Sequence, residues 1–261
     1  MLKNKVKAID LAIQRGIPKN QLFLQYQPII KISDASIYAA ETFIRWNHPM
    51  YGYVKPADWL PKVAKSGALA EILLEFINEC VSNAKTLAGP ILSFNLSCYE
   101  LNNVECINSL CKSAVQAEGR IAAEIYELDF DEDLVPPEQG WPFVPVENFV
   151  ECLTQLDESG IQIWVDDYGA RGGAKHTLNH PLVDVVKLDM SVLWEARKGN
   201  PDGLVSYTEV GHRHGKLMLI ERVESKADFD IVKAAGIDLV QGFYFSRALH
   251  FADLVHLLAN R

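Results

Sequence analysis

The sequence lacks the segments that mark membrane and secreted proteins. No apolar run reaches the roughly 18 residues that a membrane-spanning helix needs. The positively charged first residues are not followed by the apolar core of a secretory signal, and no internal repeat or low-complexity tract is present. We therefore expect a cytoplasmic globular domain that has no membrane partner.

Cysteine is scarce and follows no metal-binding or disulfide pattern. The five cysteines form no CxxC pair and no zinc-binding spacing. Their odd number fits the reduced thiols of the cytosol better than a disulfide framework. We expect ordinary buried or surface thiols, because a free cysteine usually serves as a packing residue.

Positive charge is in deficit. There are 25 Lys and Arg residues against 34 Asp and Glu residues, which gives a formal net charge of −9 and a pI near 5.3. This balance argues against a protein that holds duplex nucleic acid or an anionic membrane by bulk charge. A small phosphate-bearing ligand is still compatible with it, because a few cations can reverse the electrostatic field inside one cleft.

Short β-branched or aromatic runs alternate with helical patterns along the chain. The eight predicted strands are Leu22–Ile30, Ile37–Trp46, Ile91–Ser97, Ile121–Leu128, Ile161–Tyr168, Val183–Asp189, Lys216–Val223 and Leu239–Phe245. Apolar residues recur at helical spacing over Ala68–Leu87, Val146–Ser159, Lys226–Ala235 and Phe251–Asn260. This alternation predicts a mainly parallel sheet with helices packed outside it.

The number of strands indicates a closed barrel. Eight strands in about 240 residues match a (β/α)8 barrel. The first two are joined only by Lys31–Ser36, which is too short for a crossover helix, so they should be antiparallel. We predict an α/β fold, a TIM-like (β/α)8 barrel with one antiparallel strand, over residues 22–261. A helical lead-in over residues 1–21, with a helix at Lys5–Gln14, would cover one barrel end, and the Pro-rich Asp129–Pro145 would cross the barrel mouth.

Polar side chains interrupt the strands near their carboxyl ends. They are Gln27, Glu41, Asn95, Glu124, Glu127, Asp166, Asp167, Lys187, Glu221, Glu224 and Gln241. A single acid at a strand end is usually a helix cap or a solvated loop residue, Asn95 could be a turn residue, and Lys187 could be a salt-bridged structural lysine. Because a barrel gathers all its strand ends around one mouth, the pattern on all eight strands favours a shared site.

The chemistry of these residues suggests a metal centre. Several carboxylates in one cleft repel one another unless cations are present. Oxygen ligands with an amide, and without Cys or His, suit Mg²⁺ or Mn²⁺ better than Zn²⁺. The adjacent Asp166 and Asp167 could bridge two ions, an arrangement that supports phosphodiester cleavage.

Eight short segments together resemble a known family. They are Tyr26-Gln27-Pro28-Ile29, Glu41-Thr42-Phe43-Ile44-Arg45-Trp46-Asn47-His48-Pro49, Phe94-Asn95-Leu96-Ser97, Glu124-Ile125-Tyr126-Glu127, Val165-Asp166-Asp167-Tyr168-Gly169, Val186-Lys187-Leu188-Asp189, Ile220-Glu221-Arg222-Val223-Glu224 and Gln241-Gly242-Phe243. In this order and spacing they resemble the EAL domain, the bacterial cyclic di-GMP phosphodiesterase family, from about Leu22 to Arg261. The resemblance implies hydrolysis of one phosphodiester bond of cyclic di-GMP to linear pGpG, with one or two Mg²⁺ or Mn²⁺ ions.

The resemblance also implies a role for each polar residue. The ligands of the first metal would be Glu41, Asn95, Glu124 and Asp166. Asp166 and Asp167 would serve the second metal. Lys187 would hold the attacking water or an oxygen bound to the metal, and Glu221 would be the general base or a partner of the second metal.

The remaining residues would support the reaction or contact the substrate. Glu127 would steady the loop after Asp167, and Gln241 would support the network of metal and water. Arg45 would pair with a ligand phosphate, although its neighbour Trp46 also allows it to stack or to extend its stem along apolar surface. The other expected substrate contacts are Gln27 and Glu224.

The sequence departs from the family pattern at several positions. Thr42 and Phe43 stand where the family usually has Ala and Leu, and Phe43 could crowd a bound guanine. Arg222 replaces a glycine, and it could pair with a neighbouring Glu or point away. Tyr126 replaces a threonine. The loop that follows Asp167, which includes Arg171, keeps its length but loses the family's small polar residues.

Three hypotheses follow. The leading one is an active cyclic di-GMP phosphodiesterase, because every expected metal-binding position carries a competent side chain. The second is a catalytically weak or inactive EAL domain that acts as a cyclic di-GMP receptor or binds a regulatory protein, which the altered loop motivates. The third is another metal-dependent phosphodiesterase on the same barrel. Regulation would come from a protein partner, expression level or a homodimer.

Overall fold

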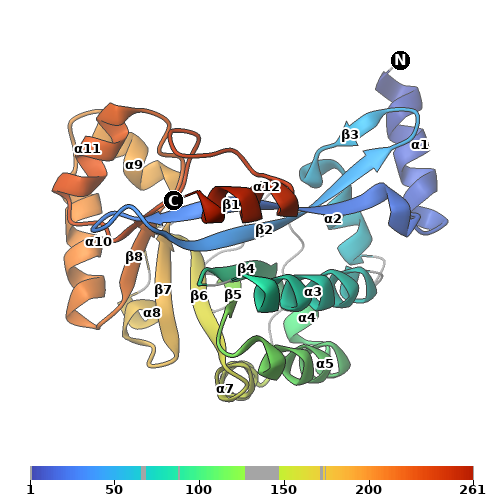
Figure 1. Cartoon of the computed structure of the whole chain (residues 1–261), viewed down its shortest axis with the longest axis horizontal. Helices are drawn as coiled ribbons and strands as arrows, with labels where there is room; N and C mark the ends of the chain where they lie inside the picture. The colour runs from blue at the N-terminus through green and yellow to red at the C-terminus, as the bar shows by residue number, and fades with distance from the viewer. Residues whose placement is uncertain are drawn as a thin grey trace.

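Eight strands close into a barrel in which one strand is reversed (Figure 1). The computed structural model describes residues 2–65, 69–87, 89–126, 147–170, 173 and 175–260. The barrel strands are β1 (Leu22–Lys31), β2 (Ile37–His48), β4 (Ile91–Leu96), β5 (Ile121–Tyr126), β6 (Ile161–Tyr168), β7 (Val183–Leu188), β8 (Leu217–Ile220) and β9 (Leu239–Val240). Strands β2 and β4–β9 pair in parallel, and β1 closes the barrel by pairing antiparallel with both β2 and β9. The predicted fold class is confirmed.

The reversed strand follows from the short turn between β1 and β2. Ser36 donates hydrogen bonds from its backbone N and its Oγ to Asp34 Oδ1, at 2.9 and 2.6 Å. Ala35 donates its backbone N–H to Lys31 O at 2.9 Å. A turn of this length can only send the chain straight back, so the two strands form an antiparallel hairpin.

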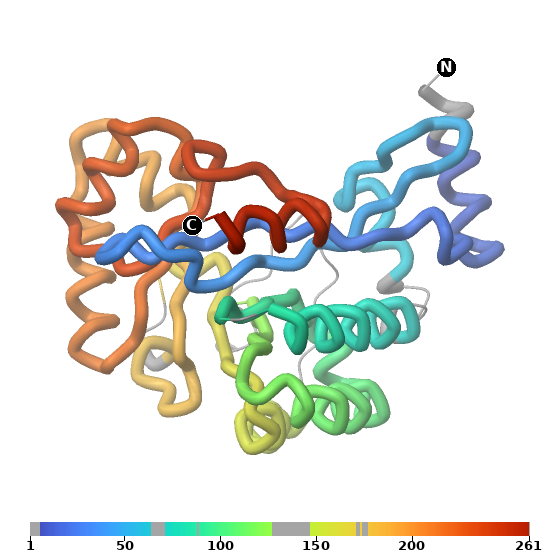
Figure 2. The backbone as a smooth tube through the Cα atoms, viewed as in Figure 1, coloured from blue at the N-terminus to red at the C-terminus, as the bar shows by residue number. Residues whose placement is uncertain are grey.

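The hairpin of β1 and β2 extends beyond the part of β2 that pairs with the barrel strand β4. It carries a short extra strand, β3 (Gly52–Val54), which pairs antiparallel with the end of β2. Figure 2 shows the hairpin running across the molecule to the N-terminal helix. The sequence patterns did not predict β3, because three residues give no measurable alternation.

Helices cover the outside of the barrel. Their bounds are α1 (Leu2–Gln14), α2 (Pro56–Lys65), α3 (Leu69–Thr86), α4 (Cys98–Leu101), α5 (Val104–Ala114), α7 (Phe149–Glu158), α8 (Lys175–Asn179), α9 (Met190–Arg197), α10 (Asp202–Arg213), α11 (Lys226–Ala234) and α12 (Phe251–Ala259), with 3-10 turns at Lys19–Gln21 and Val115–Ala117. Helices α3, α5 and α7 lie on one side, α9–α11 lie on another, and α1 packs against α2 (Figure 1). None of the helices described is long and apolar enough to cross a lipid bilayer.

The barrel interior is layered. Its floor is an apolar cluster with one residue from each strand: Ile29, Ala39, Ile91, Ala122, Trp164, Val185, Leu219 and Leu239. In a strand, the residue two positions away faces the same side. Two positions nearer the mouth, every strand therefore presents a polar residue: Gln27, Glu41, Ser93, Glu124, Asp166, Lys187, Glu221 and Gln241. The fold thus sets one polar layer on an apolar floor.

A larger apolar core lies between the barrel and its helices. All five cysteines are buried free thiols, which confirms the expectation that they form no disulfide framework. The predicted Pro-rich excursion over Asp129–Pro145, and Glu127 before it, lie outside the described residues.

Candidate active site

Lys187 stands at the centre of the polar layer. It is fully buried, and its Nζ lies 2.8 Å from Glu221 Oε1, 3.0 Å from Asp166 Oδ1 and 3.5 Å from Glu41 Oε2. It also donates a hydrogen bond to Glu124. Burial alone lowers the pKa of Lys187, but the surrounding carboxylates raise that pKa well above its usual value, so the side chain stays an ammonium. The structure therefore brings together acids from four other strands around one cation.

Glu124 is held from both sides. Its Oε2 accepts from Lys187, and its Oε1 accepts from the hydroxyl of Ser93 on the neighbouring strand β4. Burial, followed by the charge of Glu41, raises the pKa of Glu124 well above its usual value, while Lys187 opposes the rise. Sequence reasoning did not single out Ser93. The available signal was its place two residues before Asn95, on the same face of β4.

Glu41 is fixed by two amides. Asn95 Nδ2 donates to Glu41 Oε1 at 3.2 Å, and Gln241 Nε2 donates to Glu41 Oε2 at 3.0 Å. Gln241 Oε1 is buried and has no hydrogen-bond partner within the described residues. That oxygen can therefore accept a hydrogen bond from a ligand or a water at this point of the site.

Two acids at the mouth have pKa values near neutrality. Burial and the charges of Asp166 and Glu41 raise the pKa of Glu221 to about 7 against the opposing effect of Lys187. Burial and the charges of Asp166 and Glu221 raise the pKa of Asp167 to about 7. Asp167 has a left-handed backbone with φ of 55°, a conformation that is uncommon for residues other than glycine and that aspartate tolerates better than most.

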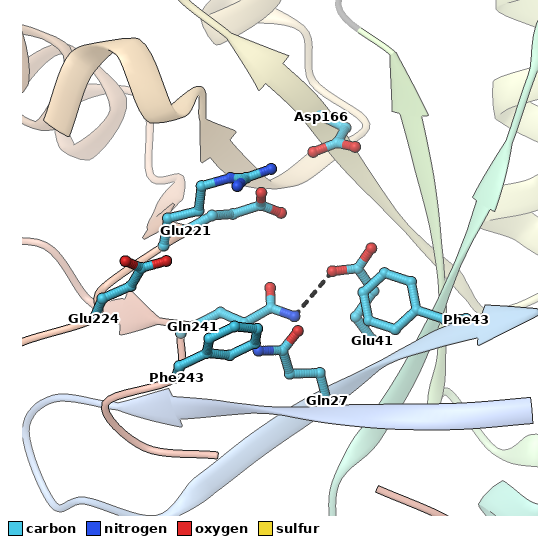
Figure 3. Close-up of a pocket in the computed structure, with 10 residues that line it drawn as sticks. Gln27, Glu41, Phe43, Asp166, Glu221, Glu224, Gln241 and Phe243 are labelled. Atoms are coloured by element: carbon cyan, nitrogen blue, oxygen red, sulfur yellow. Dashed lines mark hydrogen bonds between the residues drawn. The ribbon is translucent and has the colours of Figure 1, made fainter. Parts of the chain in front are cut away.

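A cavity of about 300 Å³ opens above these residues (Figure 3). Its lining is Gln27, Glu41, Phe43, Asp166, Glu221, Arg222, Glu224, Gln241, Gly242 and Phe243. Figure 3 shows the carboxylates of Asp166, Glu221 and Glu41 grouped on one side of it, with Phe43 and Phe243 flanking Gln27. The cavity therefore joins the polar layer to two aromatic rings.

The predicted substrate contacts differ in position. Gln27 is half-buried and donates from Nε2 to Ser246 O at 3.2 Å, and the exposed Glu224 lies at the cavity rim. Arg45 is not among the lining residues. Its guanidinium lies 4.4 Å from the centre of the Phe43 ring, and its Nε donates to Gln25 Oε1 at 3.0 Å. Of the two interpretations of Arg45, stacking describes its present contacts.

Comparison with known proteins identifies the family. A family model described as the EAL domain matches residues 10–248. The chain belongs to the EAL domain family. It is 22% identical over 99% of its length to the probable cyclic di-GMP phosphodiesterase PdeG of Escherichia coli K12, and 24% identical over 94% to the cyclic di-GMP phosphodiesterase NbdA of Pseudomonas aeruginosa. It spans 50% of the length of PdeG and 31% of NbdA.

Solved EAL structures share the fold. The PaMucR phosphodiesterase in complex with c-di-GMP superimposes with a TM-score of 0.81 and 20% identity, covering 95% of this chain and 99% of that one. The FimX EAL domain of Pseudomonas aeruginosa, bound to c-di-GMP, gives a TM-score of 0.74 and 22% identity, covering 94% of this chain and 96% of that one. At these identities the likeness establishes the EAL fold alone.

The donor atoms of this EAL domain suit a hard divalent cation. Four carboxylates face a single ammonium, so the carboxylate groups of the cluster outnumber its one cation. Carboxylate oxygens and the unpartnered Gln241 Oε1 match the preference of Mg²⁺ and Mn²⁺. Within the part of the chain that the structure describes, no group of three or more His, Cys, Asp or Glu residues is already arranged around an ion position. The side chains fit such an ion in type and charge, and it would compete with Lys187 for them.

Arg222 is one of the positions at which this EAL domain departs from the family motif. Its backbone is left-handed, with φ of 57°, which is the conformation that glycine adopts without penalty. Among the described residues, no carboxylate pairs with its side chain, so neither of the expected pairings with Glu221 or Glu224 forms. Arg171, a basic substitution in the loop after Asp167, lies outside the described residues.

Proposed function

We propose that this protein hydrolyses one phosphodiester bond of cyclic di-GMP to give linear pGpG in a reaction that needs Mg²⁺ or Mn²⁺. The observation that carries the proposal is the convergence of Glu41, Glu124, Asp166 and Glu221 on Lys187 beneath an open cavity. Membership of the EAL domain family and relatives named as cyclic di-GMP phosphodiesterases support it.

We assign the metal ligands at the mouth as the resemblance to the EAL family implies. Glu41, Asn95, Glu124 and Asp166 would hold the first ion. Asp166 and Asp167 would hold the second. Ions bound there would lower the pKa of the attacking water and would place positive charge beside the phosphate oxygens.

Glu221 is the best placed general base. Its pKa of about 7 means that a large fraction is ionised at neutral pH while the carboxylate stays basic enough to take a proton. The water oxygen forms a bond to phosphorus while its proton passes to Glu221. The bond between phosphorus and O3′ breaks, and O3′ takes up a proton from solvent to become the free 3′-hydroxyl group. Lys187, whose Nζ lies 2.8 Å from Glu221 Oε1, would orient the carboxylate and stabilise developing negative charge.

Substrate contacts would come from the cavity wall. Gln27 and Glu224 line the cavity and present polar atoms to a bound nucleotide. Arg45 would have to leave the Phe43 ring and Gln25 to reach a phosphate in the cavity. We therefore propose Gln27 and Glu224 ahead of Arg45 as substrate contacts.

A second candidate is a catalytically weak EAL domain that acts as a cyclic di-GMP receptor. Two observations favour it: Arg222 lies in the cavity wall next to Glu221, and the described carboxylates are gathered on Lys187 without a ready arrangement for an ion. Such a receptor would act by binding a regulatory protein or by forming a homodimer.

Incubation of the pure protein with cyclic di-GMP and Mn²⁺, followed by chromatography of the nucleotides, separates the two candidates. The phosphodiesterase proposal predicts pGpG from wild type and a loss of roughly 100-fold or more in rate for Glu221→Gln, the scale of a lost general base. Tight cyclic di-GMP binding without any pGpG would support the receptor. An absence of both binding and turnover would overturn both.

A further inference from the structure

Arg222 is the one basic residue among the ten that line the cavity. The same lining carries four acids: Glu41, Asp166, Glu221 and Glu224. Lys187 lies beneath them, fully buried and surrounded by carboxylates. A phosphate that enters this cavity therefore meets a strongly negative wall in which Arg222 is the only accessible cation among the described lining residues.

The backbone at Arg222 is held in a conformation that disfavours a side chain. Its φ of 57° lies in the left-handed region, where an L-residue costs free energy that glycine does not. Arg197 Nη2 donates to Arg222 O at 2.9 Å, and Val223 N donates to Gln241 O at 3.1 Å. These contacts would fix the same conformation with glycine in place, so the arginine side chain is retained at a cost to stability.

The guanidinium is free to bind. Arg222 is exposed, and among the described residues its side chain makes no hydrogen bond or ion pair. Glu221 on one side is engaged by Lys187, and the backbone of Glu224 on the other is tied to Asp228. A strained residue with unused charged donors at a cavity points to a ligand contact.

We propose that Arg222 binds a phosphate group of the cyclic dinucleotide in this cavity, through its guanidinium at the rim. This inference rests on the proposed function. It adds a phosphate contact from the Arg222 side chain at a position where the family's glycine has no side chain. Arg222 holds the ligand at the rim beside Glu221, and it contributes to affinity more than to the chemical step.

Equilibrium binding of cyclic di-GMP in the presence of Mn²⁺ tests the role, with the Glu221→Gln protein as a background that suppresses turnover. Adding Arg222→Gly should weaken binding by about tenfold or more, the scale of one lost charge-assisted contact. Arg222→Lys should retain part of the affinity because it keeps the charge, whereas Arg222→Gln should behave like the glycine variant. High salt should reduce the differences in cyclic di-GMP affinity among the Arg222 variants, because it screens the charge of the guanidinium.

Thermal unfolding supplies the control for folding. Arg222→Gly removes the left-handed penalty, so its Tm should equal or exceed that of the parent. Binding by the glycine variant that is unchanged or tighter would overturn this inference alone, and tighter binding would make Arg222 an obstruction. Wild-type protein that neither binds nor hydrolyses cyclic di-GMP would overturn the proposed function as well.

Discussion

Gln241 donates a hydrogen bond to Glu41 at 3.0 Å, although 200 positions separate the two residues in the chain. Glu41 lies on β2, and Gln241 directly follows β9. The reversed strand β1 pairs with both of these strands, so the bond spans the seam where the barrel closes. Closure of the barrel therefore brings Glu41 and Gln241 together and completes the polar layer at this point.

Removal of the central cation should destabilise the protein strongly. Lys187→Met leaves four carboxylates, two of them almost fully buried, without their shared partner. We expect the free energy of unfolding to fall by about 3–5 kcal/mol in urea titrations without added metal. Lys198→Met removes an exposed pair with Glu195 and should change stability by less than about 0.5 kcal/mol. Equal effects of the two substitutions would contradict the assignment of Lys187 as the centre.

Metal binding should be visible in thermal stability. If Asp166 ligates an ion, Mn²⁺ should raise the Tm of wild type through preferential binding to the folded state. Asp166→Asn should lose most of that rise, and EDTA should reverse it in wild type. Asp184→Asn is the matched control, because Asp184 lies at the start of β7 and accepts from Ile163 N. A rise that survives Asp166→Asn would place the ion elsewhere.

The loop after Glu221 should lose its anchor at acid pH. Asp228 accepts from Arg197 at 2.7 and 2.9 Å and from the backbone of Glu224 and Ser225, and these bonds outweigh burial and lower its pKa below the usual 3.8. A lowered folded-state pKa gives stability that is present above pH 3.8 and is lost as pH falls through the folded value.

Asp228→Asn should therefore cost about 1–3 kcal/mol at neutral pH. Urea titrations across the acid range should show the gap between wild type and Asp228→Asn shrinking below about pH 4. A gap that widens towards low pH would refute the role of the ionised carboxylate.

A close backbone approach at the cavity should tolerate no side chain. A Cβ added at Gly242 would lie 2.1 Å from Val223 O and 2.5 Å from Val223 N. Gly242→Ala should lower the free energy of unfolding by about 2 kcal/mol or more and impair nucleotide binding, because the loops after β8 and β9 must separate. Gly203→Ala, on α10 with no atom within 4 Å of the added Cβ, should be neutral or stabilising by up to about 1 kcal/mol.

The polar layer could be predicted from the sequence because one physical rule generates it. Residues such as Glu41 and Lys187 interrupt strands that are otherwise apolar, and a barrel brings such interruptions together. Ser93 escaped notice because a serine in a strand is unremarkable until its partner Glu124 is known. Arg45 could not be placed, because its contacts with Phe43 and Gln25 depend on the register of β1 and β2.

Backbone conformation was the least accessible feature. The left-handed φ of Arg222 follows from contacts with Arg197 and the loop around Gln241, which come from distant parts of the chain. Local propensity carries no record of such tertiary contacts.

Hydrolysis of cyclic di-GMP in ¹⁸O-labelled water tests the central claim most directly. With Mn²⁺ present, mass spectrometry of the product should find pGpG that carries one ¹⁸O atom in its 5′-phosphate, and Glu221→Gln should form little or none. Wild-type protein that yields no pGpG, or pGpG without the label, would contradict the account.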